Sequence, residues 1–142
     1  MFNSSDKDKD KSINKIETLI GDGCTVIGSL KGEDLLKIDG YFEGNIIWQD
    51  DIIIGATGYC KGDISCKSAY ISGKVEGNIC CEGILAVESY GKVFGDVNVK
   101  NIIIRDGGIF QGKCTVLTPE EITTIEWYYA KIIERLMSFY FY

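Results

Sequence analysis

Gly73-Lys-Val-Glu-Gly-Asn-Ile79 decides the fold, because variants of this seven-residue stretch recur along the chain. The other copies are Thr25–Leu30, Gly40–Ile46, Gly58–Ile64, Gly91–Val97 and Gly108–Cys114. Their second glycine falls at positions 28, 44, 62, 77, 95 and 112, so successive copies lie 15 to 18 residues apart. Repeats of this length indicate a solenoid, in which each copy forms one turn, or coil, of a stack.

Alignment of the six copies on that glycine sorts the apolar residues into columns. Two residues before the glycine stand Val26, Phe42, Cys60, Val75, Val93 and Phe110, and two residues after it stand Leu30, Ile46, Ile64, Ile79, Val97 and Cys114. A further column upstream contains Ile20, Ile38, Ile54, Ile71, Val87 and Ile104. Alternation with a period of two predicts strands with one buried face. Since one copy cannot bury that face alone, we predict an all-β parallel β-helix of about six coils with a dry interior.

Eleven of the 17 glycines occupy two positions of the repeat. The aligned position holds Gly28, Gly44, Gly62, Gly77, Gly95 and Gly112, and the other glycines lie four residues earlier at 40, 58, 73, 91 and 108. We interpret both positions as coil corners, where the chain turns and a Cβ would crowd the core. The longer coils contain two extra residues, which we place at one corner, as in Gly55-Ala56-Thr57.

Length, charge and the N-terminal residues narrow the class of protein. The chain has 142 residues, the size of one domain, and a net charge of -6 that disfavours nucleic-acid partners. Residues 1–17 form a polar tail without the apolar centre of a signal peptide, and no apolar run approaches the roughly 20 residues of a membrane-spanning helix. We therefore expect a flexible N-terminal tail, a cytoplasmic location and reduced cysteines.

The chain contains no histidine, which argues against the main enzymatic alternative. That alternative is the left-handed β-helix of hexapeptide acyltransferases and related zinc enzymes, which use histidine as a base or metal ligand. The apolar positions also do not follow a six-residue period. We predict that the protein is not an enzyme and has no cofactor, no nucleotide and no metal site.

Six cysteines offer a second alternative, a metal site near Cys66, Cys80 and Cys81. However, Cys60, Cys66, Cys81 and Cys114 occupy inward columns in which other copies have apolar residues. Buried free cysteine behaves as a small hydrophobic residue, so we assign these four to the core. Cys80 has the opposite parity, and we expect it to be the most reactive thiol.

The last 25 residues, 118–142, have a different pattern. Thr118-Pro119-Glu120-Glu121 combines a helix N-cap, a first-turn proline and a capping-box glutamate. Apolar residues then recur at helical spacing, at Ile122, Ile125, Tyr129, Ile132, Ile133 and Leu136. We predict an amphipathic helix with an aromatic end that covers the open C-terminal coil. The alternative is a helix that docks on a partner or on a membrane surface.

Residues 18–117 resemble the bactofilin family of polymer-forming bacterial cytoskeletal proteins. The resemblance rests on the Gly73–Ile79 repeat and its variants, on Leu36-Lys-Ile-Asp-Gly40 and on Ile20-Gly-Asp-Gly-Cys-Thr-Val-Ile-Gly28. It implies a right-handed solenoid that assembles end to end into filaments without nucleotide. It also implies a scaffold for cell shape or envelope machinery in bacteria. Members of the family usually end in disordered tails, whereas this chain is predicted to end in a helix.

The resemblance also assigns residues to two surfaces. Apolar residues of the terminal coils pack subunit against subunit in this family, which implies a polymer interface at Phe110, Ile109 and Val116. The start Met1-Phe2 matches the short membrane-targeting peptide of many members. The expected partners are therefore other copies of this chain, the inner face of the cytoplasmic membrane and cell-envelope proteins.

Overall fold

The computed structural model describes residues 16–118, and within them it contains 16 strands and no helix. Residues 1–15, which include Met1 and Phe2, and residues 119–142, which include almost all of the predicted helix, lie outside the described residues. The first strand begins at Ile16, so Ile16 and Glu17 belong to the solenoid and not to the tail to which we assigned them.

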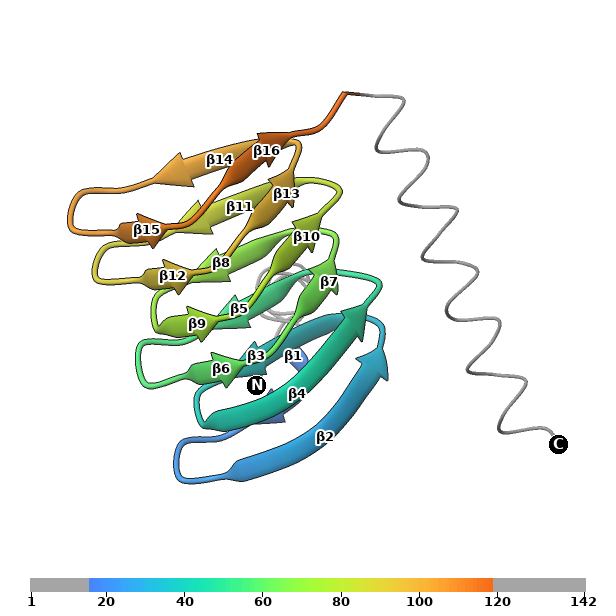
Figure 1. Ribbon diagram of the computed structural model, residues 1–142. Coiled ribbons are helices and arrows are strands. Elements are labelled where there is room, and N and C mark those ends of the chain that lie inside the picture. Colours follow the sequence, from blue (N-terminus) through green and yellow to red (C-terminus); the bar gives the residue numbers. More distant parts are fainter. Residues whose placement is uncertain (1–15, 119–142) are drawn as a thin grey trace, which may run out of the picture.

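The strands form two parallel sheets that enclose the core (Figure 1). Sheet A contains β1 (Ile16–Ile20), β3 (Leu35–Ile38), β5 (Ile52–Ile54), β8 (Ala69–Ile71), β11 (Ile84–Val87) and β14 (Asn101–Ile104). Sheet B begins with two long strands, β2 (Thr25–Gly32) and β4 (Tyr41–Trp48). Its shorter strands are β6 (Tyr59–Lys61), β7 (Ile64–Cys66), β9 (Lys74–Glu76), β10 (Ile79–Cys81), β12 (Lys92–Phe94), β13 (Val97–Val99), β15 (Ile109–Gln111) and β16 (Cys114–Val116).

Each coil contributes one strand to sheet A and then crosses to sheet B. Coils 1 and 2 are β1–β2 and β3–β4, and coils 3 to 6 each contain three strands, from β5–β7 to β14–β16. Followed toward the C-terminus, the chain runs left to right along the near face and returns along the far face as it rises (Figure 1). This winding is right-handed. The predicted parallel solenoid of about six coils is therefore confirmed.

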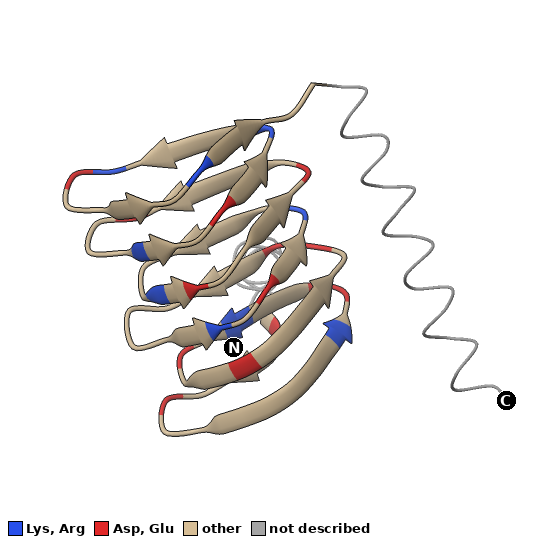
Figure 2. Cartoon of the chain, in the orientation of Figure 1, with Lys and Arg blue, Asp and Glu red and all other residues tan. Residues whose placement is uncertain are grey.

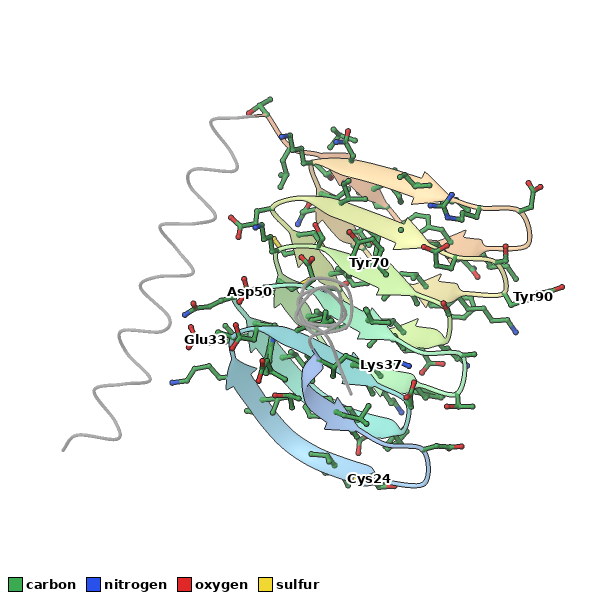
Figure 3. All side chains as sticks on the ribbon, turned by 180° about the vertical axis from the view of Figure 1, so that it is seen from behind. Cys24, Glu33, Lys37, Asp50, Tyr70 and Tyr90 are labelled. Atoms are coloured by element: carbon green, nitrogen blue, oxygen red, sulfur yellow. The ribbon has the colours of Figure 1, made fainter. Side chains whose placement is uncertain are left out.

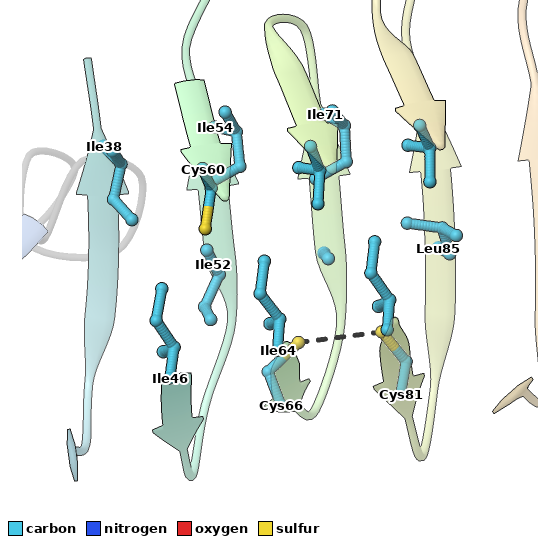
Figure 4. Packing of buried hydrophobic residues seen from close by; sticks show 14 of the residues in the cluster. Ile38, Ile46, Ile52, Ile54, Cys60, Ile64, Cys66, Ile71, Cys81 and Leu85 are labelled. Carbon is cyan, nitrogen blue, oxygen red and sulfur yellow. Dashed lines mark hydrogen bonds between the residues drawn. The ribbon is translucent and has the colours of Figure 1, made fainter. Parts of the chain in front are cut away.

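Strand register confirms the columns read from the sequence. Val26 pairs with Phe42, Phe42 with Cys60 and Cys60 with Val75, and the same column continues through Val93 to Phe110. These side chains and their counterparts in the other inward columns form one continuous core (Figure 4). Among the described residues, no polar or charged side chain is buried. Stacked copies thus bury the apolar face that a single copy would expose.

Corners between sheets A and B explain the two coil lengths. The long corners are closed by a hydrogen bond between residues three apart, from the Gly58 amide to the Gly55 carbonyl and from the Gly91 amide to the Glu88 carbonyl. A turn of this kind absorbs the two extra residues of a long coil at the corner where we placed them. The strands above and below keep their register as a result.

Glycine is required at the aligned position, but for a reason that differs from our expectation. All six aligned glycines have φ between 136° and 153°, a range that side-chain-bearing residues rarely adopt. A Cβ added at Gly44, Gly62, Gly77, Gly95 or Gly112 would approach the carbonyl oxygen of the aligned glycine one coil earlier to less than 3.0 Å. The preceding coil's backbone, and not the core, occupies the space that a side chain would need.

A ladder of polar side chains runs beside this glycine column. The Asn78 amide donates to Asp63 Oδ1 at 3.0 Å, the Asp96 amide to Asn78 Oδ1 at 3.1 Å and the Lys113 amide to Asp96 Oδ1 at 3.0 Å. Each side-chain oxygen therefore binds the equivalent residue of the next coil. Lysine has no acceptor oxygen, so the ladder ends at Lys113 in coil 6.

We predict that Gly77→Ala destabilises the solenoid far more than Gly21→Ala. A methyl group at Gly77 meets both the Gly62 carbonyl and an unfavourable φ of 149°, whereas Gly21 has open space around its Cβ position. We expect Gly77→Ala to lower the free energy of unfolding by at least about 3 kcal/mol and Gly21→Ala to change it by less than about 1 kcal/mol. Denaturant unfolding followed by circular dichroism at one protein concentration measures both values. Equal losses of stability in the two variants would contradict the close backbone contact at the aligned glycines.

Candidate assembly interface

The strands at the two ends of the stack are paired on one side only. Among the described strands, β1 pairs only with β3 and β2 only with β4 in coil 1, and β14, β15 and β16 of coil 6 pair only with β11, β12 and β13. Every strand of the coils between them has a neighbour on both sides. Each end therefore presents a row of backbone N–H and C=O groups that can accept a further strand.

Coil 6 also exposes inward side chains that are buried in the coils below. Val99 is 0% exposed but Val116, one coil later in the same column, is 60% exposed. In the same way, Val87 is 0% exposed and its register partner Ile104, one coil later, is 49% exposed. These side chains belong to inward columns, and in residues 16–118 no further coil lies over them. The C-terminal end of the described solenoid thus exposes a cross-section of the apolar core.

All three residues of the predicted interface lie in this last coil. Phe110 is half-buried against the core and Val116 is exposed, both in inward columns. Ile109 is exposed but pairs with Lys92 in an outward column, so it lies at the rim of the end. Sequence reasoning missed Ile104, which could have been found because it ends an inward column that we had identified.

The N-terminal end also has inward apolar side chains that are only half-buried. We did not predict this end as an interface. Val26 and Leu30 are half-buried members of the two inward columns and pack against the core. A Cβ on Gly28 would meet no atom within 4 Å, unlike the other aligned glycines. The glycine column is therefore open at this end. The signal was available in the sequence, because these residues begin the columns that Phe110 and Cys114 end.

Cysteines inside the solenoid have the environment of inert core residues. Burial raises the pKa of the Cys60 thiol to about 12. Cys66 and Cys81 are paired in register with their sulfur atoms 3.6 Å apart, and this hydrogen bond together with burial raises the pKa of Cys66 well above its usual value. Among residues 16–118, no group of three or more potential ligands could hold a metal ion.

Exposure of the remaining cysteines changes our expectation for Cys80. Cys80 is only partly exposed, and burial raises its pKa, which lowers the fraction of thiolate. Cys24 in coil 1 and Cys114 in coil 6 are exposed. Cys114 belongs to an inward column, as predicted, but lies uncovered at the open end. The accessible thiols are therefore those of the two ends.

Charged residues occur along the strands and at the corners of the solenoid (Figure 2), and none of those in the described residues is buried. Residues 16–118 contain no helix that is long and apolar enough to cross a membrane. The functional surfaces that the described structure offers are therefore its two open ends and its flanks.

Comparisons with known proteins agree on one family. The family model named Bactofilin, "Polymer-forming cytoskeletal", matches residues 18–115. Bactofilin BacO of Myxococcus xanthus (strain DK1622) is 30% identical over 95 residues, which cover 67% of this chain and 75% of BacO. Bactofilin BacP of the same organism is 30% identical over 107 residues, which cover 75% of this chain but 45% of BacP.

A solved structure shares the fold. The cryo-EM reconstruction of Thermus thermophilus bactofilin double helical filaments superimposes with a TM-score of 0.61 and 20% identity. The match covers 68% of this chain and 98% of that one. At this identity the likeness establishes the parallel solenoid fold.

We predict a fixed order of thiol alkylation in the dispersed protein. Cys24 and Cys114 react first because they are exposed, and Cys80 reacts more slowly because it is partly buried. Cys60, Cys66 and Cys81 react only after unfolding. Timed iodoacetamide labelling at pH 8 with peptide mass spectrometry measures the order. Early labelling of Cys60 in the folded protein would contradict the continuous core.

Proposed function

This chain belongs to the bactofilin family of polymer-forming cytoskeletal proteins, and we propose that it polymerises by stacking the open ends of its solenoid. Each new subunit continues the parallel sheets of the one before it. The filament is then a solenoid interrupted only at the joints between chains, and no nucleotide is needed to form it.

The supporting observation is the exposure of core columns at the last coil. Ile104 and Val116 are each about half exposed or more, whereas their partners Val87 and Val99 are fully buried. Full burial of such a side chain contributes about 1.5–3 kcal/mol, so a few of them at one joint provide a strong driving force. A second solenoid also pairs the free backbone groups of β14, β15 and β16, which side chains alone cannot do.

A structural role in the cytoplasm fits the described residues better than catalysis. Every buried side chain between 16 and 118 is apolar, so the interior offers no polar groups to orient a substrate. We propose a scaffold that organises cell shape or envelope machinery. Met1-Phe2 then provides weak contacts with the inner face of the cytoplasmic membrane, and these contacts add up along a filament.

We predict that Val116→Arg and Phe110→Arg, made separately, prevent filament formation. Each places a charge in an apolar joint, where an unpaired charge is unfavourable. The control is Asn98→Arg, which introduces the same charge at an exposed outward position of β13, one coil from Val116. Negative-stain microscopy and light scattering at matched concentration, without nucleotide, measure assembly.

Val116→Arg separates the interface from the fold. Val116 is largely exposed in a single solenoid, so the variant keeps its β-sheet circular dichroism while filaments disappear. Phe110 packs partly against the core, and loss of its β-sheet signal would assign it to the core instead. Normal filaments from Val116→Arg would contradict stacking through coil 6. Protection of Cys114 from alkylation in wild-type filaments provides an independent readout.

A further inference from the structure

An apolar stripe runs along the outer face of sheet A. Its outward side chains are in register from coil 1 to coil 6 and are Leu19, Lys37, Ile53, Tyr70, Ala86 and Ile103. We call this set the flank stripe, and five of its six members are apolar or aromatic. Leu19 is 57% exposed and Ile103 39%, Ile53 and Tyr70 are half-buried, and Ala86 is buried. Lys37 and Tyr70 mark the stripe in Figure 3.

Sheet B has outward aromatic residues as well, but these already have intramolecular partners. Lys74 Nζ lies 5.0 Å from the ring centre of Tyr59 and 5.6 Å from that of Phe94, and it forms an ion pair with Glu76 at 2.9 Å. Tyr41 also packs on Tyr59, with ring centres 5.3 Å apart. Of the six members of the flank stripe only Lys37 is charged, so the other side chains offer a surface for an apolar partner.

We propose that the C-terminal segment, residues 119–142, packs as an amphipathic helix along the flank stripe. The described chain ends where this packing can begin. Leu117 follows Val116 of β16, and its amide donates to the Val99 carbonyl at 2.7 Å. Lys100 has the equivalent place one coil below, because it follows Val99, the register partner of Val116. After Lys100 the chain enters β14 of sheet A. Leu117 therefore occupies the corner that leads to sheet A.

Length favours the same arrangement. The apolar positions of the segment extend from Ile122 to Leu136, which is about 21 Å in a helix that rises about 1.5 Å per residue. Six coils at the inter-strand spacing of about 4.8 Å place Leu19 and Ile103 about 24 Å apart. A helix that starts beside coil 6 and runs toward coil 1 would cover the whole stripe.

The charges at one edge of sheet A favour that direction. The corner that leads into sheet A carries Glu33, Asp34, Asp50 and Asp51 in its first turns, Lys67 and Glu82 in its middle turns and Lys100 near coil 6. Figure 3 shows Glu33 and Asp50 at this edge. The segment begins with Glu120, Glu121 and Glu126 and continues with Lys131, Glu134 and Arg135. Its acidic start thus lies near Lys100, and its two basic residues approach the aspartates.

The flank is a better site for a helix than the open end. Backbone groups of a helix are already paired internally, so a helix cannot satisfy the free N–H and C=O groups of β14, β15 and β16. Outward side chains of sheet A require only apolar cover, because the backbone beneath them is already bonded within the sheet. Docking on the flank also leaves both ends free for assembly.

A photo-crosslinking experiment on the full-length chain tests the placement. p-Benzoylphenylalanine replaces Ile53 in the flank stripe and, in separate proteins, Val116 at the open end and Asn98 on sheet B. We expect the probe at 53 to crosslink to residues 122–136 of the same chain, and the probes at 116 and 98 not to reach that segment. A mixture of ¹⁴N and ¹⁵N chains distinguishes crosslinks within a chain from those between chains.

Hydrogen exchange provides a second measurement that does not depend on the probe. Tyr70→Glu places a charge in the stripe at a partly exposed position, and we expect amide exchange in residues 119–142 to accelerate at least tenfold. The matched control is Ser65→Glu, at a partly exposed position of β7 in sheet B, with no change expected. Unchanged β-sheet circular dichroism in both variants shows that the solenoid is intact.

Four results would overturn the proposal. Crosslinks from position 116 to residues 122–136 would place the segment over the open end. Crosslinks from position 53 to residues 16–118 of another chain would assign the stripe to lateral contact between copies. Protection of residues 119–142 that arises only with phosphatidylglycerol vesicles would assign the segment to a membrane. Equal exchange in Tyr70→Glu and Ser65→Glu would show that the stripe does not hold it.

Discussion

Close contact between the backbones of successive coils is the constraint on which the rest of the structure depends. At the aligned position, each glycine lies so near the carbonyl oxygen of the glycine one coil earlier that no Cβ fits between them. This contact sets the corner at which sheet B bends, and it repeats from Gly28 to Gly112. Once that corner is fixed, the residues two before and two after it must point inward. The apolar columns and the dry core follow from it.

Much of the fold could be predicted because the repeat imposes the same environment on every copy. Period-two alternation identified the inward columns, and the spacing between glycines located the turns that close the long coils. The reason for glycine could not be found in this way, because the atoms that exclude a side chain belong to a different coil. The contact between Gly32 and Trp48, which pair in register, could not be predicted either. The indole of Trp48 fills the space that a side chain at position 32 would need.

Of the two ends that form the candidate assembly interface, only the C-terminal one was predicted from the sequence. A resemblance to a family directed attention to Phe110, Ile109 and Val116, all at the C-terminal end. The same columns begin at Val26 and Leu30, so the first copy carried the same signal, but the resemblance was applied only to the last copy. The flank stripe was missed because outward positions vary in type from copy to copy. The register of sheet A places Leu19, Ile53 and Ile103 on one surface.

Assembly by stacking means that the joint between two subunits repeats the geometry between two coils of one subunit. Cryo-EM of filaments formed by the full-length chain tests this most directly, through the axial rise per subunit and the spacing across the joint. Six coils at about 4.8 Å predict a rise of about 29 Å per subunit, with the inter-strand spacing continuing through the joint. A rise several ångströms longer, or a joint without strand density, would contradict the account, because the open ends would then not be paired.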